Sequence, residues 1–305
     1  MLTRISDLEA TLANRKKKAT LVAAAVEDAN TFDAVFTARE KDFVDITLIG
    51  DERKIYNIAQ QKGTDLNDIS VIHEPDDHLA GARAVELVHA DKAEILMNGQ
   101  ESYHGGTVIG RAVIDKERGI SRGARISHLA LCELEEYHKL IGITDLVFNN
   151  CPNLKAKAAI IKNAVFFMRI IGIKMPKVAV LGAVEVVNES MPATMDAAML
   201  AKMAERGQIK NCIVEGPLAF DNAISEEHAH HKGIDNVVSG DPDILLAPDI
   251  ETAGMLYQSF VFFANAKVAS IALGASVPIV LTSKLDSPET RLNSILLAAA
   301  LYAKN

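Results

Sequence analysis

Tryptophan is absent from the 305-residue chain, aromatic residues make up only 5% of it, and it carries no surplus of basic residues. The formal net charge is −8 at pH 7. Proteins that bind nucleic acids need cations to neutralise phosphates, and those that bind single strands also use aromatic rings for stacking. The composition therefore argues against a nucleic-acid partner.

Cysteine is scarce as well, with Cys132, Cys151 and Cys212 scattered along the chain and no CxxC spacing. A disulfide framework or a structural zinc site needs clustered cysteines. We therefore expect neither of them, and we interpret the cysteines as small apolar side chains. Cys151 follows two asparagines at the end of an expected strand and is the one to test as a nucleophile.

Long apolar runs are also missing, and none could span a bilayer. Residues 15–18 (RKKK) precede the apolar run ATLVAAAV and imitate the start of a signal peptide, but Glu27 and Asp28 follow at once and no cleavage pattern is present. A first β-strand explains this segment better. We expect a cytoplasmic protein with no membrane partner.

Short apolar runs alternate with longer helical patterns along the chain. The runs are continuous, as in strands that helices cover on both faces of a parallel sheet. We expect strands at 20–26, 46–50, 70–73, 94–97, 126–132, 145–148, 177–181, 212–214, 243–246, 268–273 and 279–282. We expect helices at 51–62, 77–90, 152–171, 192–206, 250–265 and 287–302. This alternation predicts an α/β fold built from βαβ units with right-handed crossovers.

Two familiar phosphate-binding patterns are absent: the chain has neither GxGxxG nor GxxxxGK[ST]. Three histidines, His228, His230 and His231, lie close together in EHAHHK, but without the HExxH repeat of a zinc helix. We interpret them as a solvated or partner-facing helix end.

A turn rich in glycine, serine and threonine follows the expected strand at 94–97. It comprises residues 97–99 (MNG), Ser102 and residues 104–107 (HGGT), and Arg111 lies in the next helix. Such a turn before a helix offers backbone N–H groups to an anion, and an arginine can clamp a phosphate or carboxylate bidentately. A plain loop with a surface arginine explains the residues equally well, so both interpretations stay open.

Two further segments combine turn residues with polar side chains. In residues 215–225 (EGPLAFDNAIS), Gly216-Pro217 is expected to break a strand, and the polar residues beyond it either cap a helix or line a ligand-binding loop at a strand end. Residues 282–289 (TSKLDSPE) begin the last helix with a serine, a lysine and two carboxylates. They form either a capping motif with a surface ion pair or a site that binds an oxyanion and moves a proton.

Several long motifs in series resemble the phosphate acetyl/butyryltransferase family, and within it the phosphate butyryltransferases, also called phosphotransbutyrylases or branched-chain phosphotransacylases. They are residues 178–198 (VAVLGAVEVVNESMPATMDAA), 206–225, 230–234 (HHKGI), 243–259 (DILLAPDIETAGMLYQS) and 277–295 (VPIVLTSKLDSPETRLNSI). The resemblance is strong from about residue 145 onward and weaker but continuous from about residue 95.

The resemblance implies a reaction and a fold. The reaction is acyl-CoA plus phosphate to acyl phosphate plus CoA, reversibly, with no metal and no redox cofactor. The fold is like that of isocitrate/isopropylmalate dehydrogenases, with two α/β domains and a central cleft, in a homodimer. We expect one domain from residues 1–143 and 283–305 and the other from 144–282, within about ten residues.

The resemblance also implies site residues. Arg111 falls on the family's phosphate-binding arginine, with the loop to Thr107 beside it, and Ser127 falls near another contact. The substrate loops of the second domain bring Asp221, Asn222, Asp249 and Glu251. Ser283 and Lys284 fall where the family has a Ser-Arg pair by the reacting carbonyl; lysine cannot make the bidentate fork of arginine.

The base is the least defined role. The acetyl enzymes have an aspartate one turn into the last helix, where this chain has Thr290, so Asp286 or Glu289 takes the role instead. We expect direct transfer in a ternary complex, because no cysteine or serine has an evident partner base. The alternatives are a phosphate acetyltransferase, a non-catalytic sensor of acyl-CoA or acyl phosphate, and a metal- and NAD-dependent dehydrogenase of the same fold, which would need clustered aspartates.

Overall fold

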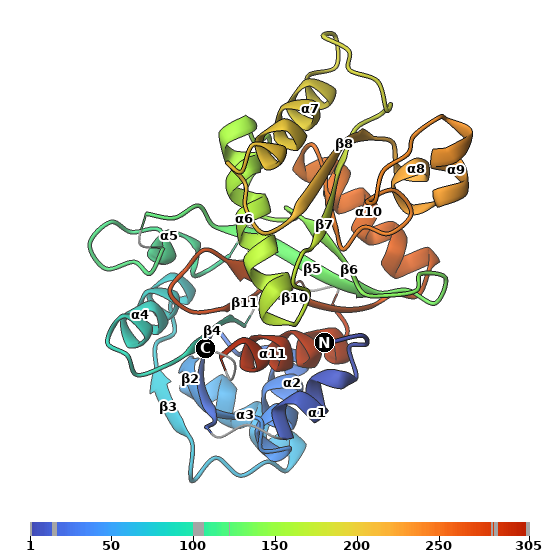
Figure 1. Cartoon of the computed structure of the whole chain (residues 1–305). Coiled ribbons are helices and arrows are strands. Elements are labelled where there is room, and N and C mark those ends of the chain that lie inside the picture. The colour runs from blue at the N-terminus through green and yellow to red at the C-terminus, as the bar shows by residue number, and fades with distance from the viewer. Residues whose placement is uncertain are drawn as a thin grey trace. The chain divides into compact units, whose positions relative to one another are not determined.

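The computed structural model describes residues 2–13, 17–99, 107–121, 123–281, 283 and 286–302. Its contacts form two compact units, shown in Figure 1. The first unit comprises Ser6–Ala124 and Ala269–Asn305, and the second comprises Met1–Ile5 and Arg125–Val268. The sequence placed the boundaries at 143/144 and 282/283. The two units instead divide at 124/125 and 268/269. The first of these boundaries lies earlier than predicted because residues 127–144 form a hairpin whose second strand pairs with a strand of the second unit.

The first unit has the strand order β3-β2-β1-β4-β11-β10. All neighbours are parallel except β10 and β11, which are antiparallel. The strands are β1 Ala19–Ala24, β2 Val44–Gly50, β3 Ser70–His73, β4 Ile95–Asn98, β10 Lys267–Leu273 and β11 Ile279–Leu281. The helices are α1 Asp7–Ala13, α2 Ala29–Glu40, α3 Glu52–Lys62, α4 Asp77–His89, α5 Gly110–Val113 and α11 Pro288–Tyr302.

Right-handed crossovers place α2 and α3 on one face of these strands and α4 on the other. Helix α11 packs against α2, with α1 beside it, while α4 packs on β1 and β2 (Figure 1). Strand β1 is almost entirely buried because it is a central strand with helices on both faces. This is the continuous apolar pattern on which the strand prediction rested.

The second unit has the strand order β5-β6-β9-β7-β8. Strands β5 and β6 are antiparallel, and the other neighbours are parallel. The strands are β5 Ser127–Glu133, β6 Ile141–Thr144, β7 Lys177–Leu181, β8 Ile213–Leu218 and β9 Ile244–Leu246. The helices are α6 Leu154–Ile170, α7 Pro192–Glu205, α8 Phe220–Ile224, α9 Glu226–His231 and α10 Ile250–Phe263.

Helices α6 and α7 contact each other and pack on this sheet, α6 on β5, β6 and β9 and α7 on β7 and β8. A buried apolar cluster joins strands β5 to β9 to α8 and α10, with Ile143, Leu245 and Phe260 among its members. The α/β class expected from the sequence is confirmed, and most expected elements are present within two residues of their predicted ends.

Two expectations about single elements were wrong. Residues 145–148 do not form a strand: β6 ends at Thr144, and the Asp145 carboxylate accepts the amides of Val147 and Phe148 in a turn. Gly216-Pro217 does not break β8, which continues to Leu218. Glycine is required there because an added Cβ would lie 2.7 Å from the carbonyl oxygen of Val180 on β7.

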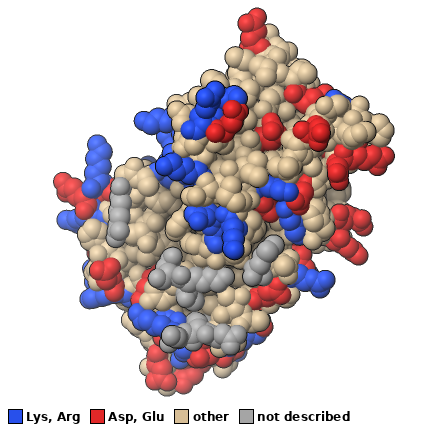
Figure 2. Space-filling view, in the orientation of Figure 1, with Lys and Arg blue, Asp and Glu red and all other residues tan. Residues whose placement is uncertain are grey.

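Charged side chains of both signs share the face seen in Figure 2. Acidic side chains gather over α9, whose first turn contains Glu226 and Glu227. Within the described ranges, no helix is long and apolar enough to cross a membrane.

Candidate active site

Three parallel strands of the first unit end at the same edge. Ala24 of β1 and Leu281 of β11 both lie opposite Asn98 of β4. The segments that follow these strands therefore emerge side by side, at the carboxyl edge where open α/β sheets bind ligands. The Asn98 side chain accepts the amide of Val108 at 2.9 Å and ties down the chain where it returns from the glycine-rich turn. Residues 100–106 of that turn, with Ser102, lie outside the described residues.

Thr107 and Arg111 follow this turn. Arg111 is exposed on α5 and lines a cavity of about 360 Å³ together with His78 and Arg118. No carboxylate of the described residues lies within 4.0 Å of Arg111, whereas Arg118 lies 3.9 Å from Glu86. Within the described ranges, Arg111 is therefore a cation without a carboxylate partner, available to an anion.

The loop after β11 is closed by two reciprocal hydrogen bonds. The amide of Ser283 donates to the Asp286 carboxylate at 2.7 Å, and the amide of Asp286 donates to the carbonyl of Ser283 at 3.1 Å. Ser287 then caps α11 by accepting the amide of Thr290 at 3.0 Å, and Glu289 is exposed in the first turn. Lys284 lies outside the described residues. Ser287 therefore supplies the helix cap of the capping interpretation, whereas the surface ion pair that it includes would involve Lys284 and stays a prediction.

The sequence reasoning missed a buried arginine beneath this loop. Arg291 is only 2% exposed and contacts the carboxylate of Asp28, the hydroxyl of Thr31 and the carbonyls of Ser283 and Asp286. A signal was available, because Arg291 shares one helical face with the apolar residues Ile295 and Ala298.

In the second unit, Lys232 joins two carboxylates that follow neighbouring strands. Its ammonium lies 3.1 Å from Glu185, beyond β7, and 3.1 Å from Asp221, beyond β8. The hydrogen bond from Lys232 lowers the pKa of Asp221, and the hydrogen bonds to Asp221 and Glu185 raise the pKa of Lys232. The trio is solvent-accessible and keeps both carboxylates ionised.

Asn222 is fully buried beside this trio. Its Nδ2 donates to Glu185 at 3.3 Å, and its Oδ1 has no hydrogen-bond partner within the described part of the chain. Asp249 follows β9 and caps α10 by accepting the amide of Thr252 at 2.8 Å, and Glu251 is exposed in the first turn of that helix. Asp221, Asn222, Asp249 and Glu251 therefore all follow the carboxyl ends of β8 and β9.

Ser127 begins β5 and is 1% exposed, with its hydroxyl accepting from Asn163 at 2.9 Å. The neighbouring His128 is buried, and neither ring nitrogen has a partner among the residues described here. Burial lowers the pKa of His128 to about 4, against the opposing effect of the Asp145 charge. Ser127 is thus buried at the start of β5, next to a buried, neutral histidine.

The described residues hold no group of three or more histidine, cysteine, aspartate or glutamate side chains arranged for a metal ion. The histidines of α9 are engaged locally: His228 Nδ1 lies 2.7 Å from the Ser225 hydroxyl, and His231 Nδ1 lies 2.9 Å from the carbonyl of Glu227.

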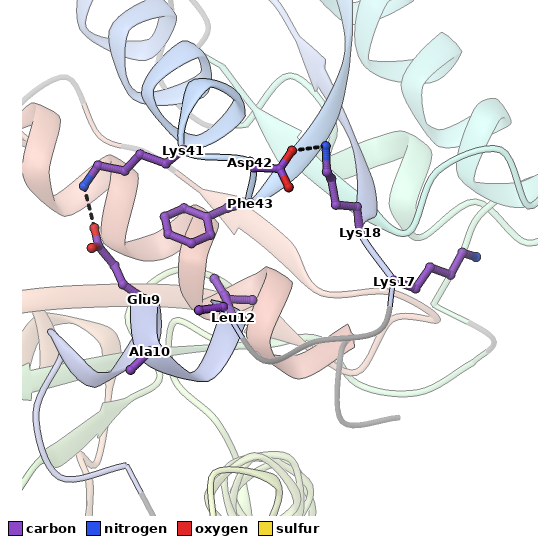
Figure 3. Close-up of a pocket in the computed structure, with 9 residues that line it drawn as sticks. Glu9, Ala10, Leu12, Lys17, Lys18, Lys41, Asp42 and Phe43 are labelled. Carbon is purple, nitrogen blue, oxygen red and sulfur yellow. Dashed lines mark hydrogen bonds and ion pairs between the residues drawn. The ribbon is translucent and has the colours of Figure 1, made fainter.

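A cavity of about 830 Å³ in the first unit is lined by none of the candidate residues (Figure 3). Its three lysines are already paired, Lys41 with Glu9 at 2.6 Å, Lys18 with Asp42, and Lys17 with Glu94 at 3.4 Å. Arg111, the basic side chain among the described residues of the first unit's candidate site, does not line this cavity.

Comparison with known proteins places this geometry in a family. The model of the phosphate acetyl/butaryl transferase family matches residues 76–299. The chain belongs to this family. The match includes both strand-end segments of the first unit's candidate site, from Thr107 to Arg111 and from Ser283 to Glu289.

Named family members are similar over nearly the whole chain. A phosphate butyryltransferase of Clostridium acetobutylicum is 43% identical over 299 residues, 98% of each chain. A phosphate acetyltransferase of Thermotoga maritima is 40% identical over 285 residues, 93% of this chain and 96% of that one. Among solved structures, a branched-chain phosphotransacylase from Enterococcus faecalis covers 93% of this chain and 98% of its own, with a TM-score of 0.80 and 27% identity.

Proposed function

We propose that this member of the phosphate acetyl/butaryl transferase family catalyses the reversible transfer of a butyryl or branched short-chain acyl group between CoA and inorganic phosphate. Family membership supports the reaction type. The structural observation that carries the proposal is the parallel pairing of β4 and β11, with Asn98 opposite Leu281. Because Asn98 and Leu281 are paired, the segments that lead to Arg111 and to Ser283 leave the sheet from neighbouring strands, and this supports a site where phosphate meets an acyl carbonyl.

In the direction of acyl phosphate formation, a phosphate oxygen attacks the thioester carbonyl carbon. The C–S bond breaks from the tetrahedral intermediate, and the CoA thiolate leaves and takes a proton. Arg111 and the loop to Thr107 hold the phosphate, because a guanidinium pairs bidentately with phosphate oxygens. Ser283 and Lys284 stabilise the negative charge that develops on the carbonyl oxygen.

In the reverse direction, a carboxylate takes the proton of the CoA thiol. We assign this role to Glu289, with Asp286 as the second candidate. Glu289 is exposed in the first turn of α11, whereas the Asp286 carboxylate already accepts the amide of Ser283. A base must have an oxygen free to reach the thiol.

We assign the remaining predicted residues to substrate binding. Asp221, Asn222, Asp249 and Glu251 follow strand ends, and Ser127 begins β5. Transfer is direct, in a ternary complex. The reaction balances without an electron carrier or metal, so CoA is a substrate and no cofactor is invoked. We further propose a homodimer in the cytoplasm, where CoA thioesters are available, with acyl-CoA, CoA and phosphate as its only partners.

The roles of the arginines can be separated with a matched pair of variants. Arg111→Met should raise the KM for phosphate at least tenfold, because one charge-assisted contact is worth about 1.5–3 kcal/mol. Arg118→Met removes a cation from the same cavity that is already close to Glu86, and its KM for phosphate should stay within about twofold of wild type. Equal effects of the two substitutions would contradict the assignment of Arg111.

The substrate class is tested by following CoA-thiol release from acetyl-, propionyl-, butyryl- and isobutyryl-CoA, with and without phosphate. We expect phosphate-dependent release that is fastest with butyryl- or isobutyryl-CoA. Fastest release with acetyl-CoA would indicate the acetyltransferase instead, since one methylene changes specificity by only about 1–3 kcal/mol. Binding of acyl-CoA without release would indicate a sensor.

A further inference from the structure

Helix α11 buries a full positive charge beneath the Ser283 loop. Arg291 is 2% exposed, and it is the only buried arginine among the described residues. A buried guanidinium is costly unless its N–H groups find partners, so its contacts indicate what it holds in place.

All three guanidinium nitrogens of Arg291 are used. NH1 donates to the Asp28 carboxylate at 2.8 Å and to the hydroxyl of Thr31. NH2 donates to the carbonyl of Ser283 at 2.9 Å, and Nε donates to the carbonyl of Asp286 at 3.3 Å. One planar fork therefore grips both ends of the loop that follows β11.

The contacts of Arg291 with Asp28 and Thr31 also connect it to the loop that follows β4. The hydroxyl of Thr31 lies 2.6 Å from the carbonyl oxygen of Gly99 and 2.8 Å from the Asp28 carboxylate. Asp28 also accepts the amide of Thr31 at 2.9 Å and so caps α2. Gly99 is the last described residue before the turn that leads to Thr107 and Arg111.

We propose that Arg291 and Asp28 are positioning residues for acyl transfer, which set the Ser283 loop and, through Thr31, the start of the phosphate loop in one arrangement. This inference rests on the proposed function. Neither side chain is assigned a contact with substrate. They act by fixing the groups that hold the phosphate and the carbonyl at the distance that the attack requires, and a displacement of about 1 Å there costs on the order of 100-fold in rate.

The chain offers a matched control for the loss of a buried ion pair. Lys157 of α6 and Asp196 of α7 lie 2.7 Å apart, with side chains 6% and 20% exposed. This pair joins two helices of the second unit, whereas the two strand-end loops belong to the first unit. Breaking it should therefore lower stability without changing the geometry of those loops.

The test compares Arg291→Lys, Arg291→Met and Asp28→Asn with Lys157→Met and Asp196→Asn. For each variant, kcat, both KM values and the urea unfolding midpoint are measured. We expect kcat to fall about 10- to 100-fold in the Arg291 and Asp28 variants, with KM for acyl-CoA within about threefold of wild type. Arg291→Lys should not restore kcat, because an ammonium cannot make the fork. The control variants should lose stability and keep kcat within twofold.

Hydrogen exchange supplies a readout that does not depend on activity. In Arg291→Met, the amides of residues 283–287 and of the start of α2 should exchange faster than in wild type, and in Lys157→Met they should not. A folded Arg291→Met variant with wild-type kcat and wild-type exchange would overturn the inference, and so would an equal loss of kcat in the control pair. If the wild-type protein itself shows no phosphate-dependent release, the proposed function and the catalytic part of the inference both fail, while exchange still decides whether Arg291 anchors the loops.

Discussion

His128 makes a sharp prediction about acid stability. Its ring is buried on β5 beside Asp145, neither nitrogen has a partner within the described ranges, and burial lowers the pKa of His128 to about 4 from an ordinary 6.5. Below pH 6.5, His128 binds a proton in the unfolded chain, whereas in the folded chain it binds one only near pH 4. The stability contribution is therefore complete above pH 6.5 and is lost as the pH falls from 6.5 to 4.

The size of the loss follows from the two pKa values. A difference of 2.5 units, at about 1.4 kcal/mol per unit, gives roughly 3 kcal/mol. We would measure the free energy of urea unfolding of the second unit between pH 4 and pH 8, with hydrogen exchange of the β5 and β6 amides as the signal. His128→Leu removes the titrating group, so the variant should lose about 3 kcal/mol less than wild type across this range.

The control is His230→Asn, which removes an exposed histidine of α9. This variant should follow the wild-type curve. The reasoning is refuted if the difference between wild type and His128→Leu is flat from pH 8 to pH 4, or if wild type gains stability toward acid. A direct check is the NMR titration of the His128 ring, whose shifts should not move between pH 8 and pH 5.

Three other predictions concern backbone contacts and thiols. Gly216→Ala should destabilise the second unit by about 1–3 kcal/mol in urea unfolding, because its Cβ would lie 2.7 Å from the Val180 carbonyl oxygen; wild-type stability would contradict the β7–β8 packing. Gly99→Ala should lower kcat by about 100-fold, because its Cβ would lie 2.3 Å from the carbonyl oxygen of Ala25 and must shift the start of the phosphate loop. In the control Gly254→Ala, the added Cβ meets no atom within 4 Å, and kcat should not change. Native protein should react with a thiol reagent at the exposed Cys151 first, because burial raises the pKa of Cys132 to about 12 and the pKa of Cys212 to about 11. Cys151→Ser should keep at least half the activity. Loss of activity in this variant would contradict direct transfer.

The strands and most helices could be predicted from the sequence because their signals are local. The apolar run of β7 predicts the limits of that strand, and Asp51 and Gly63 mark the two ends of α3 by their capping chemistry. The prediction failed where a side chain or a neighbouring strand overrides the local signal. Asp145 ends β6 by accepting the amides of the turn that follows. Strand β8 continues beyond Gly216-Pro217 because it pairs with β7, with Leu218 opposite Leu181.

The candidate site also divides into residues with a local sequence signal and residues that only the tertiary fold brings together. Ser283 and Asp286 could be proposed because they follow an apolar strand directly, and Arg111 because it lies in the first helix after a glycine-rich turn. Arg291 and Asp28 could not be paired from the sequence, since 263 positions separate them and only the packing of α11 on α2 brings them to 2.8 Å. Contacts over such separations are set by the tertiary fold.

The central claim is that phosphate accepts the acyl group from CoA. The most direct measurement is phosphorus NMR of the protein with butyryl-CoA and inorganic phosphate, with free thiol determined in the same samples. The account predicts a new acyl phosphate signal that grows in equal amount with the thiol and reverses when CoA is added. Thiol released without acyl phosphate, at a rate independent of phosphate, would contradict it and identify a thioesterase.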